Sequence, residues 1–510
     1  MSLTTRIFSY SSRNRLSKLD AIRKNPYIFQ KQWFEELILS GAKTSFFHEH
    51  GLTSKTDLKQ FRNLVPLRGY DQIEPFIDRI RKGEKNVLTS SPVRWFAKSS
   101  GTSSAKSKFI PITADSLKYC HFAGMKSMLS TYVSLYPKSK IFDGDALTLG
   151  GSVSVDELGS GKSSYGDLSA ILLKNSPQWV EFRRAPKRDI ALIPDFEKKL
   201  EIMCREAQKY NVTNFSGVPS WNLVLMRAIL QYTGKNNLLE LWPNLELFMH
   251  GGINFAPYRE EYRSLVPSDQ MHYMENYNAS EGYFAFQDNP GDNSMLLLTD
   301  NGIFYEFIPM DRLDDAIAGL FTEFDTIETL RTGINYALVL TTNGGLWRYL
   351  IGDVVQFTSL KPHKLIISGR TQLFINAFGE ELMINNAEKA IAFASEKHKA
   401  IVENYTVAPI FMGGNTKGSH QWLIEFSVMP DNLDEFTKSL DAQLSRLNSD
   451  YEAKRRNDIT MAMPTITILK PHVFYEWMKR RGKLGGQNKV PRLHPNRTYA
   501  EELLALNKNE

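Results

Sequence analysis

The sequence predicts an α/β protein with a large N-terminal domain, built on mixed or parallel sheets and β-hairpins, and a small α+β C-terminal domain. Between about residues 210 and 290, short apolar runs alternate with small-residue loops and helical stretches. This order is typical of a parallel sheet. Beyond residue 295, apolar runs alternate with turn residues, which favours antiparallel hairpins.

The composition fits a globular protein of more than one domain. The chain has 510 residues, of which 42% are hydrophobic, and single cores stop growing near ~250–300 residues. The net charge of +6 is spread along the chain, so we expect small anionic ligands and no nucleic-acid partner. Two cysteines exclude a disulfide framework, and no Cys/His spacing resembles a zinc site. Neither an export signal nor an apolar run of ~18 residues is found, so we expect a cytoplasmic protein without a membrane partner. We also expect a monomer.

The predicted elements begin with a helix over residues 26–40, which opens with a proline and is stopped by Gly41. Strand and loop material is expected after it. Three strand-and-loop units follow: residues 211–215 before a helix from Trp221, residues 245–249 before a helix from Tyr258, and residues 271–276 before the loop YNASEG. Ligands bind where parallel strands end, so these loops should face one crevice.

Hairpin turns are predicted at residues 300–302 and 343–345. Two strand-like runs flank residues 369–372, and we place the domain boundary there, giving domains 1–370 and 371–510. The later domain contains a helix with a regular apolar stripe and then the strand PTITILK; the stripe consists of Phe436, Leu440, Leu444 and Leu447.

The stretch FAKSSGTSSAKSKFIPIT, residues 96–113, has the composition of a phosphate-binding loop. Small residues let backbone N–H groups approach an anion, hydroxyls add donors, and a lysine supplies charge. The alternative is a serine-rich surface turn. The candidate residues are Ser99, Ser100, Gly101, Thr102, Ser103 and Lys108.

Two further stretches carry polar groups suited to a nucleotide. In YNASEG, Tyr277 could stack on a base, Ser280 could bond a phosphate and Glu281 could hold Mg²⁺; the alternative is a polar loop at a strand end. In WRYLIGD, Asp353 ends a predicted strand and could accept two hydrogen bonds from a ribose, or could be a turn residue.

Two basic residues could add to this site. Arg370 follows Gly369 and could contact ribose or phosphate, or could lie at the surface. Lys489, within GKLGGQNKVPRL, could present its ammonium group to a phosphate, or could be solvated.

The order SSGTS…K…IP, Y-x-x-S-E, Y-x-x-G-D and Q-x-K-x-P-R resembles the auxin-responsive promoter (Gretchen Hagen) family of acyl-acid amido synthetases, within the adenylate-forming superfamily. The likeness runs along nearly the whole chain, including residues 65–88. It implies an adenylate-forming-enzyme architecture in which domain 1–370 binds ATP and an acyl substrate and the small domain is mobile about a hinge near Thr371-Gln372. The sequence departs from the plant pattern at Ala105, where the family has glycine.

The resemblance implies a role for each motif. The first motif, SSGTS, would bind the ATP phosphates, and Lys108 lies just outside this motif. The second would contact adenine and the α-phosphate, with Glu281 holding Mg²⁺; the third would place Asp353 on the ribose. Lys489 matches a lysine that stabilises charge during adenylation. The remaining matches are Tyr277, Asn278, Ala279 and Ser280 in the second motif, Gly251 and Gly252 beside the adenine and acyl group, and, more loosely, His472, Val473 and Phe474 near the amine acceptor.

The implied reaction uses ATP, Mg²⁺ and two small-molecule substrates. A carboxylic acid attacks ATP to give an acyl-adenylate and pyrophosphate, and an amine, typically an amino acid, then displaces AMP to form an amide. Two alternatives stay open: a ligase with a thiol acceptor such as coenzyme A, and a nucleotide-binding protein without catalysis.

Overall fold

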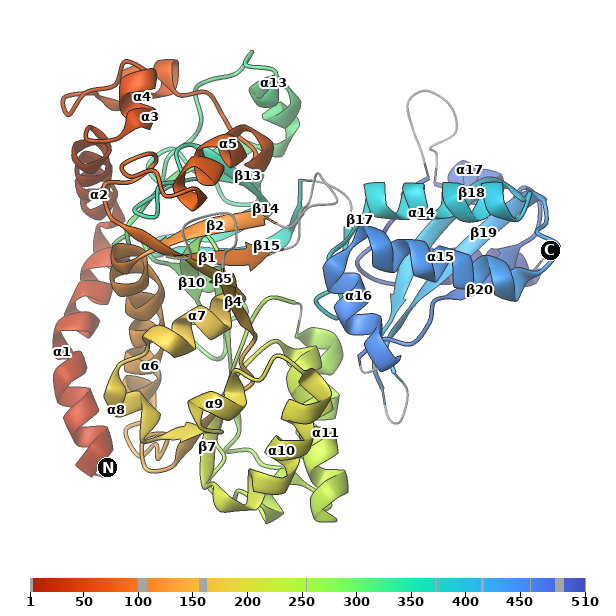
Figure 1. The fold of residues 1–510 in the computed structure, drawn as a ribbon, viewed down its shortest axis with the longest axis horizontal. Coiled ribbons are helices and arrows are strands. Elements are labelled where there is room, and N and C mark those ends of the chain that lie inside the picture. Colours follow the sequence, from red (N-terminus) through yellow and green to blue (C-terminus); the bar gives the residue numbers. More distant parts are fainter. Residues whose placement is uncertain are drawn as a thin grey trace.

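The structure is a computed structural model that describes residues 3–99, 108–155, 163–253, 255–371, 374–413, 417–458, 460–481 and 490–509. It has a large N-terminal part and a separate C-terminal part, which lie beside each other in Figure 1. Both parts combine helices with sheets. The predicted α/β fold class is therefore confirmed.

The chain from Leu3 to Arg81 is mainly helical. It forms α1 (Leu3–Lys24), α2 (Pro26–Gly41), α3 (Ser45–Glu49), α4 (Leu58–Leu64) and α5 (Tyr70–Arg81). The helix predicted over residues 26–40 is confirmed. The prediction of strands and loops directly after it is wrong, because three more helices follow. Reciprocal side-chain caps from Asp57 and Gln60 start α4, and α5 buries Ile73 and Ile77 on one face. The capping residues and the helical spacing of apolar residues therefore favour helices in this region.

A small sheet follows, with strand order β2-β1-β5-β4. Its strands are β1 (Val93–Ser99), β2 (Lys108–Thr113), β4 (Val153–Val155) and β5 (Ser164–Gly166). After β2, a π-helical turn (Ser116–His121) leads into α6 (Phe122–Leu135). The antiparallel pair β1–β2 brings the two ends of the serine-rich loop together, because Ser99 lies opposite Lys108.

The large sheet joins a parallel half to an antiparallel half, in the order β12-β13-β14-β15-β11-β10-β9-β8-β7-β3-β6. The parallel half contains β3 (Asp145–Thr148), β6 (Arg184–Ala185), β7 (Val212–Gly217), β8 (Leu247–His250) and β9 (His272–Ala279). The antiparallel half contains β10 (Gly282–Phe286), β11 (Met295–Leu297), β12 (Ile303–Pro309), β13 (Asn335–Thr342), β14 (Tyr349–Leu360) and β15 (His363–Arg370).

Helices connect the parallel strands, and two of the predicted strand-loop-helix units are confirmed. They are β7 with α11 (Pro219–Thr233) and β8 with α12 (Arg259–Leu265). The other helices of this part are α7 (Leu168–Asn175), α8 (Gln178–Glu181), α9 (Arg188–Ala191), α10 (Phe196–Glu206) and α13 (Leu313–Ile317). Both cysteines, Cys120 and Cys204, are free and buried.

The third predicted unit differs from the prediction. Tyr277, Asn278 and Ala279 continue strand β9, and only Ser280 and Glu281 form the turn, since Ala279 pairs with Gly282. The chain then returns as the antiparallel strand β10, whose residues are all buried. A helix would leave part of this apolar run exposed, whereas a strand inside the sheet buries it on both faces.

The hairpin predicted at residues 300–302 is wrong, while the one at residues 343–345 is confirmed as β13–β14. Strand β11 pairs with β10 and β15, whereas β12 pairs with β13. The side chain of Gln30, from α2, donates to the carbonyls of Thr299 (3.0 Å) and Ile303 (2.7 Å). This contact satisfies backbone groups that a hairpin would pair.

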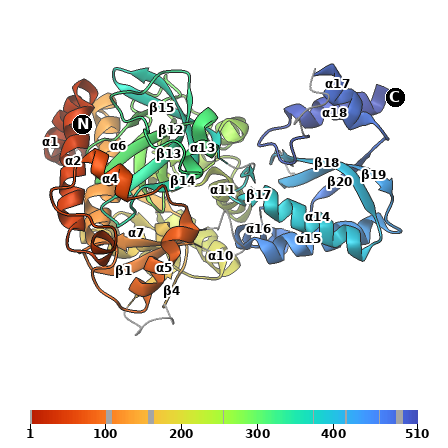
Figure 2. The same ribbon diagram turned by 90° about the horizontal axis from the view of Figure 1, so that it is seen from above.

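The C-terminal part has the sheet β18-β19-β20. Figure 2 shows α14 and α15 on one face of this sheet and α17 and α18 on the other. The predicted helix with the apolar stripe is α15, and the predicted strand PTITILK is β20. The elements are β16 (Phe374–Ile375), β17 (Leu382–Met383), α14 (Ile384–Lys397), β18 (Ile401–Ile410), β19 (Ser419–Val428), α15 (Leu433–Leu447), α16 (Ser449–Arg455), β20 (Thr465–Leu469), α17 (Val473–Arg480) and α18 (Thr498–Asn509).

The two parts touch through α11 and α16. The Lys454 ammonium lies over the Trp221 ring, 4.5 Å from its centre, and the Ser220 hydroxyl donates to the Phe378 carbonyl at 3.0 Å. One apolar cluster continues across this contact. The boundary between residues 370 and 371 stays a prediction.

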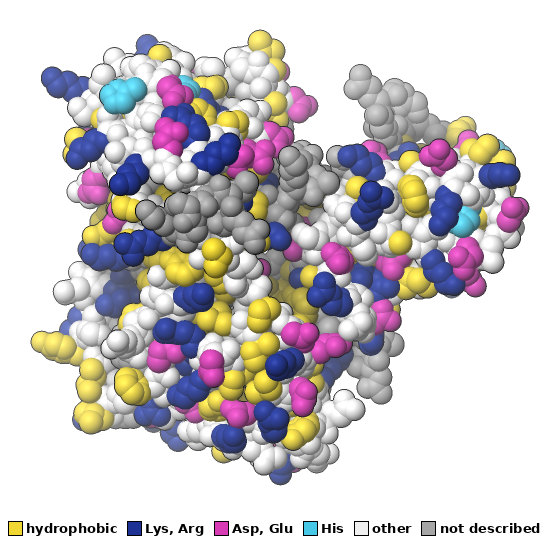
Figure 3. Space-filling view, in the orientation of Figure 1, with side chains coloured by type: hydrophobic (Ala, Val, Ile, Leu, Met, Phe, Trp, Pro, Cys, Tyr) yellow, Lys and Arg dark blue, Asp and Glu magenta, His cyan; other side chains and the backbone are white. Residues whose placement is uncertain are grey.

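Figure 3 shows basic and acidic side chains interspersed over the visible face of the molecule. Across the described ranges, none of the helices combines the length and apolar character needed to span a membrane.

Candidate active site

The antiparallel pair β1–β2 holds Lys108 in the interior of the large N-terminal part. Lys108 begins β2 and is only 5% exposed. The next residue, Phe109, donates its N–H to the Tyr70 hydroxyl at 2.8 Å and so ties β2 to the start of α5. The loop residues Ser100, Gly101, Thr102 and Ser103 lie outside the described residues, as do Gln372 and Lys489.

The turn between β9 and β10 brings Glu281 towards Lys108. Glu281 is half-buried. Burial raises the pKa of the Glu281 carboxyl, and the neighbouring Lys108 charge opposes this rise. Burial in turn lowers the pKa of the Lys108 ammonium, and the Glu281 charge opposes that fall. The two groups therefore act on each other across the site, although about 170 residues separate them in the sequence.

A second pair of motifs meets beside the first. Tyr277 is buried and donates its hydroxyl to Asp353 Oδ2 at 2.6 Å. On the other side of the same carboxylate, Arg370 Nε lies 2.9 Å from Oδ1. Asp353 and Arg370 are opposite each other in the β14–β15 ladder. This arrangement fixes the carboxylate, and each of its oxygens keeps a lone pair for a further donor.

Asp353 does not end a strand as predicted, because β14 continues to Leu360. The preceding residue, Gly352, has a φ of +96°, a conformation that glycine adopts without strain. The register of β14 against β13 shifts in this region. A bend within the strand, and not its end, therefore presents Asp353 to the site.

The described residues Lys108, Glu281, Asp353 and Arg370 form what we call the charged cluster. Burial lowers the pKa of Arg370, but the charges of Asp353 and Glu381 outweigh it, so the pKa lies above its ordinary value. The cluster combines two fixed cations with carboxylates in a water-poor setting, where charge–charge interactions are strong. Such a site can bind a polyanion and stabilise charge that develops on it.

Tyr349 has no role predicted from the sequence, and the structure brings it to the cluster. Its hydroxyl is buried and has no hydrogen-bond partner within the described ranges. Burial raises the pKa of this hydroxyl, and the charge of Glu281 raises it further. Tyr349 is the tyrosine of the Y-x-x-G-D motif, so the motif was the available signal.

Gly251 and Gly252 follow β8 and lie against β9. A side chain at Gly251 would come within 2.4 Å of the Asn276 carbonyl oxygen, and Gly252 has a φ of +84°. Asn376 donates its amide to the Gly252 carbonyl at 3.2 Å. Close packing therefore requires glycine at position 251, and the positive φ favours glycine at position 252. Both residues lie where the C-terminal part meets the large sheet.

The loosely matched segment His472-Val473-Phe474 starts α17. Val473 and Phe474 are buried in a core formed by β18, β19 and the last two helices. His472 is exposed, has a φ of +68° and donates its N–H to Glu425 Oε1 at 2.6 Å. In this arrangement only His472 offers a side chain to a ligand.

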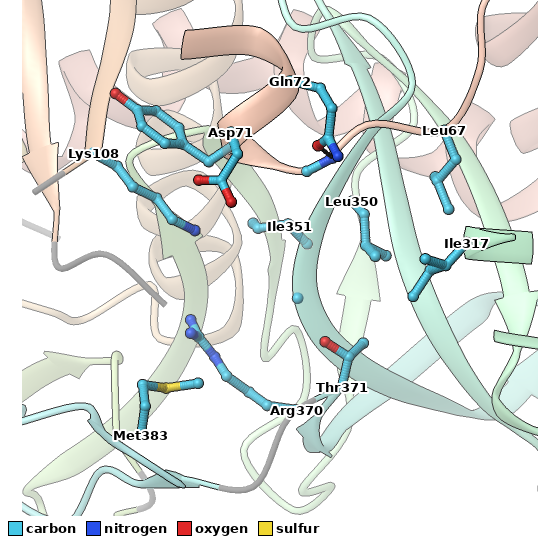
Figure 4. Close-up of a pocket in the computed structure, with 13 residues that line it drawn as sticks. Leu67, Asp71, Gln72, Lys108, Ile317, Leu350, Ile351, Arg370, Thr371 and Met383 are labelled. Carbon is cyan, nitrogen blue, oxygen red and sulfur yellow. Dashed lines mark hydrogen bonds between the residues drawn. The ribbon is translucent and has the colours of Figure 1, made fainter. Parts of the chain in front are cut away.

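A pocket of about 220 Å³ opens beside the charged cluster. Figure 4 shows Lys108 and Arg370 pointing into it from opposite sides, with apolar side chains along one wall. Its lining comes from the segment before and within α5, from β2, β14 and the end of β15, and from α13 and β17.

Comparison with models of protein families shows which family this chain belongs to. The chain matches the GH3 family N-terminal domain over residues 15–271, the GH3 family central domain over residues 296–370 and the GH3 family C-terminal domain over residues 385–498. The chain belongs to the GH3 family. The resemblance read from the four motifs is confirmed.

Curated GH3 relatives cover most of this chain. The indole-3-acetic acid-amido synthetase GH3.4 of Arabidopsis thaliana is 23% identical, covering 94% of this chain and 91% of its own. The jasmonoyl–L-amino acid synthetase JAR4 of Nicotiana attenuata is 24% identical, covering 76% of each chain. Among solved structures, a GH3.15 acyl acid amido synthetase superimposes with a TM-score of 0.60 at 19% identity, over 97% of this chain and 96% of its own. This GH3 chain therefore shares its fold with an acyl acid amido synthetase.

Proposed function

We propose that this GH3 protein is an ATP-dependent acyl acid amido synthetase. Its carboxylic acid substrate attacks the α-phosphorus of ATP, which forms an acyl-adenylate and releases pyrophosphate. An amine then attacks the acyl carbonyl and AMP leaves. The observation that carries the proposal is the charged cluster, in which the motif residues converge from distant parts of the chain. The names of the relatives support the same chemistry.

The cluster residues bind different parts of ATP. Lys108, together with the serine-rich loop that precedes it, binds phosphate oxygens. Asp353 accepts hydrogen bonds from the ribose hydroxyls, and Tyr277 and Arg370 hold its carboxylate in place. Positioning and fixed charge supply the catalysis, because phosphoryl and adenylyl transfer need no side-chain nucleophile.

Glu281 is the residue that would hold Mg²⁺. No group of three or more His, Cys, Asp or Glu side chains suited to a metal occurs among the described residues. Magnesium commonly binds through one or two carboxylates together with substrate phosphates and water, so a single carboxylate beside a phosphate site fits it. The ion would neutralise phosphate charge as the α-phosphorus is attacked.

The C-terminal domain, which we place at residues 371–510, would change position between the two half-reactions. Lys489 would reach ATP during adenylation and leave for amide formation. His472 stays a candidate for contact with the amine.

A carboxylate library tests this function. Purified protein, ATP and Mg²⁺ are incubated with each acid, and pyrophosphate release is measured with and without amino acids or coenzyme A. We expect a subset of acids to support pyrophosphate release, with an amide as the product when an amino acid is present. A thioester formed with coenzyme A, and no amide, would contradict the amide-forming function.

A further inference from the structure

The loop between β16 and β17, residues 376–381, is held in place within the C-terminal part. The fully buried Glu380 carboxylate accepts the N–H groups of Ala377 (3.1 Å) and Phe378 (2.6 Å). His420 Nε2, which is also fully buried, lies 2.8 Å from the same carboxylate. Both N–H groups are therefore satisfied within the C-terminal part, and the carbonyls of Ala377 and Phe378 need partners from outside it.

Two hydroxyls of the N-terminal part bind these two carbonyls. Tyr258, which is fully buried, donates to the first carbonyl, and Ser220 donates to the second at 3.0 Å. A third hydrogen bond joins the same loop to the glycine pair, because Asn376 donates its amide to the Gly252 carbonyl at 3.2 Å. Three consecutive residues of the loop therefore dock on the N-terminal part.

A buried cation docks beside the loop. Lys454, on α16, is 8% exposed, and its ammonium lies 4.5 Å from the centre of the Trp221 ring. A side chain at Gly379 would come within 3.1 Å of Lys454 Cε. Burial lowers the pKa of this ammonium, and nearby carboxylates, among them that of Asp167, oppose the fall. Trp221 and Asp167 belong to the N-terminal part, so the cation is stabilised across the contact.

The polar contacts give this contact its direction. The apolar cluster that continues across it supplies attraction, but burial of apolar surface does not favour any one orientation. The hydrogen bonds and the ammonium over its ring do, because their geometry is specific. A hydrogen bond between uncharged groups shifts an equilibrium by only about fivefold, so the orientation can still be left during turnover.

We propose that Ser220, Tyr258 and Lys454 form a latch that holds the C-terminal part in the arrangement of one half-reaction, so that the strength of the latch sets the ratio of the two half-reaction rates. This inference rests on the proposed function, in which the C-terminal domain changes position. The three are positioning residues, because they act through the orientation of the C-terminal part. Weakening the latch depopulates one arrangement and populates the other, so the two rates change in opposite directions.

Two tyrosines four residues apart provide a matched test. Tyr258→Phe removes a hydrogen bond between the parts. Tyr262→Phe removes one of the same kind within the N-terminal part, since the Tyr262 hydroxyl donates to the Pro219 carbonyl at 2.7 Å. Both side chains are fully buried. The rates measured are acid-dependent ATP–pyrophosphate exchange and amide formation from supplied acyl-adenylate.

We expect Tyr258→Phe and Ser220→Ala each to change the ratio of these rates by about fivefold, in the same direction. Lys454→Met should change it in that direction too, and Tyr262→Phe should leave it at the wild-type value. A ratio in Tyr258→Phe that equals the ratio in Tyr262→Phe would overturn the latch. An equal fall of both rates in Tyr258→Phe and Ser220→Ala would also overturn it.

The orientation of the parts is measured without substrates. Lys59→Cys and Lys438→Cys place one spin label on each part, because both positions are exposed while the native cysteines are buried. Pulsed EPR should show one dominant distance in the wild type and in Tyr262→Phe, and a second distance about fivefold more populated in Tyr258→Phe. Identical distance distributions would refute the latch. Absence of pyrophosphate exchange with every acid would instead refute the proposed function, and the distances would still test the latch.

Discussion

Replacing Asp353 with asparagine tests how the charged cluster binds ATP. Tyr277 can still donate to the new amide oxygen, so this hydrogen bond survives. The ion pair with Arg370 Nε at 2.9 Å is lost. The Arg370 side chain is 17% exposed, and the other carboxylate with which it pairs, that of Glu381, lies 3.8 Å away.

Two magnitudes follow from this geometry. Breaking a buried ion pair costs about 3–5 kcal/mol, and partial exposure together with Glu381 reduces the loss in the free energy of unfolding to roughly 2–3 kcal/mol. A hydrogen bond from a ribose hydroxyl to a charged acceptor contributes about 1.5–3 kcal/mol. Since each 1.4 kcal/mol is about tenfold in affinity, the KM for ATP should rise about 10–100-fold.

The assays are urea unfolding and ATP–pyrophosphate exchange at varied ATP. Tyr277→Phe is the control, because it removes one donor and keeps the ion pair; its expected stability loss is about 1 kcal/mol. If Asp353→Asn loses stability as expected but its KM for ATP stays within about twofold of the wild type, Asp353 has a structural role only, and the ribose assignment is refuted.

Three further changes probe other parts of the molecule. Lys489→Ala should lower acyl-adenylate formation by about 10²–10³-fold and spare amide formation from supplied acyl-adenylate; an equal loss in both half-reactions would contradict this. Burial raises the pKa of Glu275 from 4.5 to about 7, so the native state keeps a proton that the unfolded state loses, and stability falls as pH rises through this window. Glu275→Gln should therefore add up to about 3 kcal/mol in urea unfolding at pH 8 and nothing at pH 4; equal effects at both pH values would show that the pKa is not shifted. Glu306→Gln leaves the buried Arg348 without its ion pair and should cost about 3–5 kcal/mol in the same assay, whereas the exposed control Asp315→Asn should cost less than about 1 kcal/mol; similar losses would contradict the burial of the first pair.

Local patterns were enough to predict several elements. The spacing of Phe436, Leu440 and Leu444 predicts α15, and β7 and β8 are followed by their helices as the small-residue loops indicate. These elements follow the chain's own periodicity and caps. The prediction of a hairpin at residues 300–302 failed because backbone groups there bond to Gln30, almost 270 residues earlier. Such a distant partner cannot be found from the local sequence.

The residues of the site also divide into those that the sequence predicted and those that it missed. The four motifs identified the family, and the structure brings Lys108, Glu281, Asp353 and Arg370 together. The apolar lining of the pocket was missed, because Leu67, Ile317 and Leu350 lie far apart in the sequence and meet only when the fold puts them on one pocket.

The identity of the nucleotide products tests the central claim most directly. The protein is incubated with ATP, Mg²⁺, a carboxylic acid that supports exchange, and leucine, and the products are separated by chromatography and identified by mass spectrometry. Acyl-adenylate chemistry predicts AMP and pyrophosphate in equal amounts, together with one acyl-leucine amide for each AMP. Formation of ADP and inorganic phosphate, or of AMP without an amide, would contradict the account.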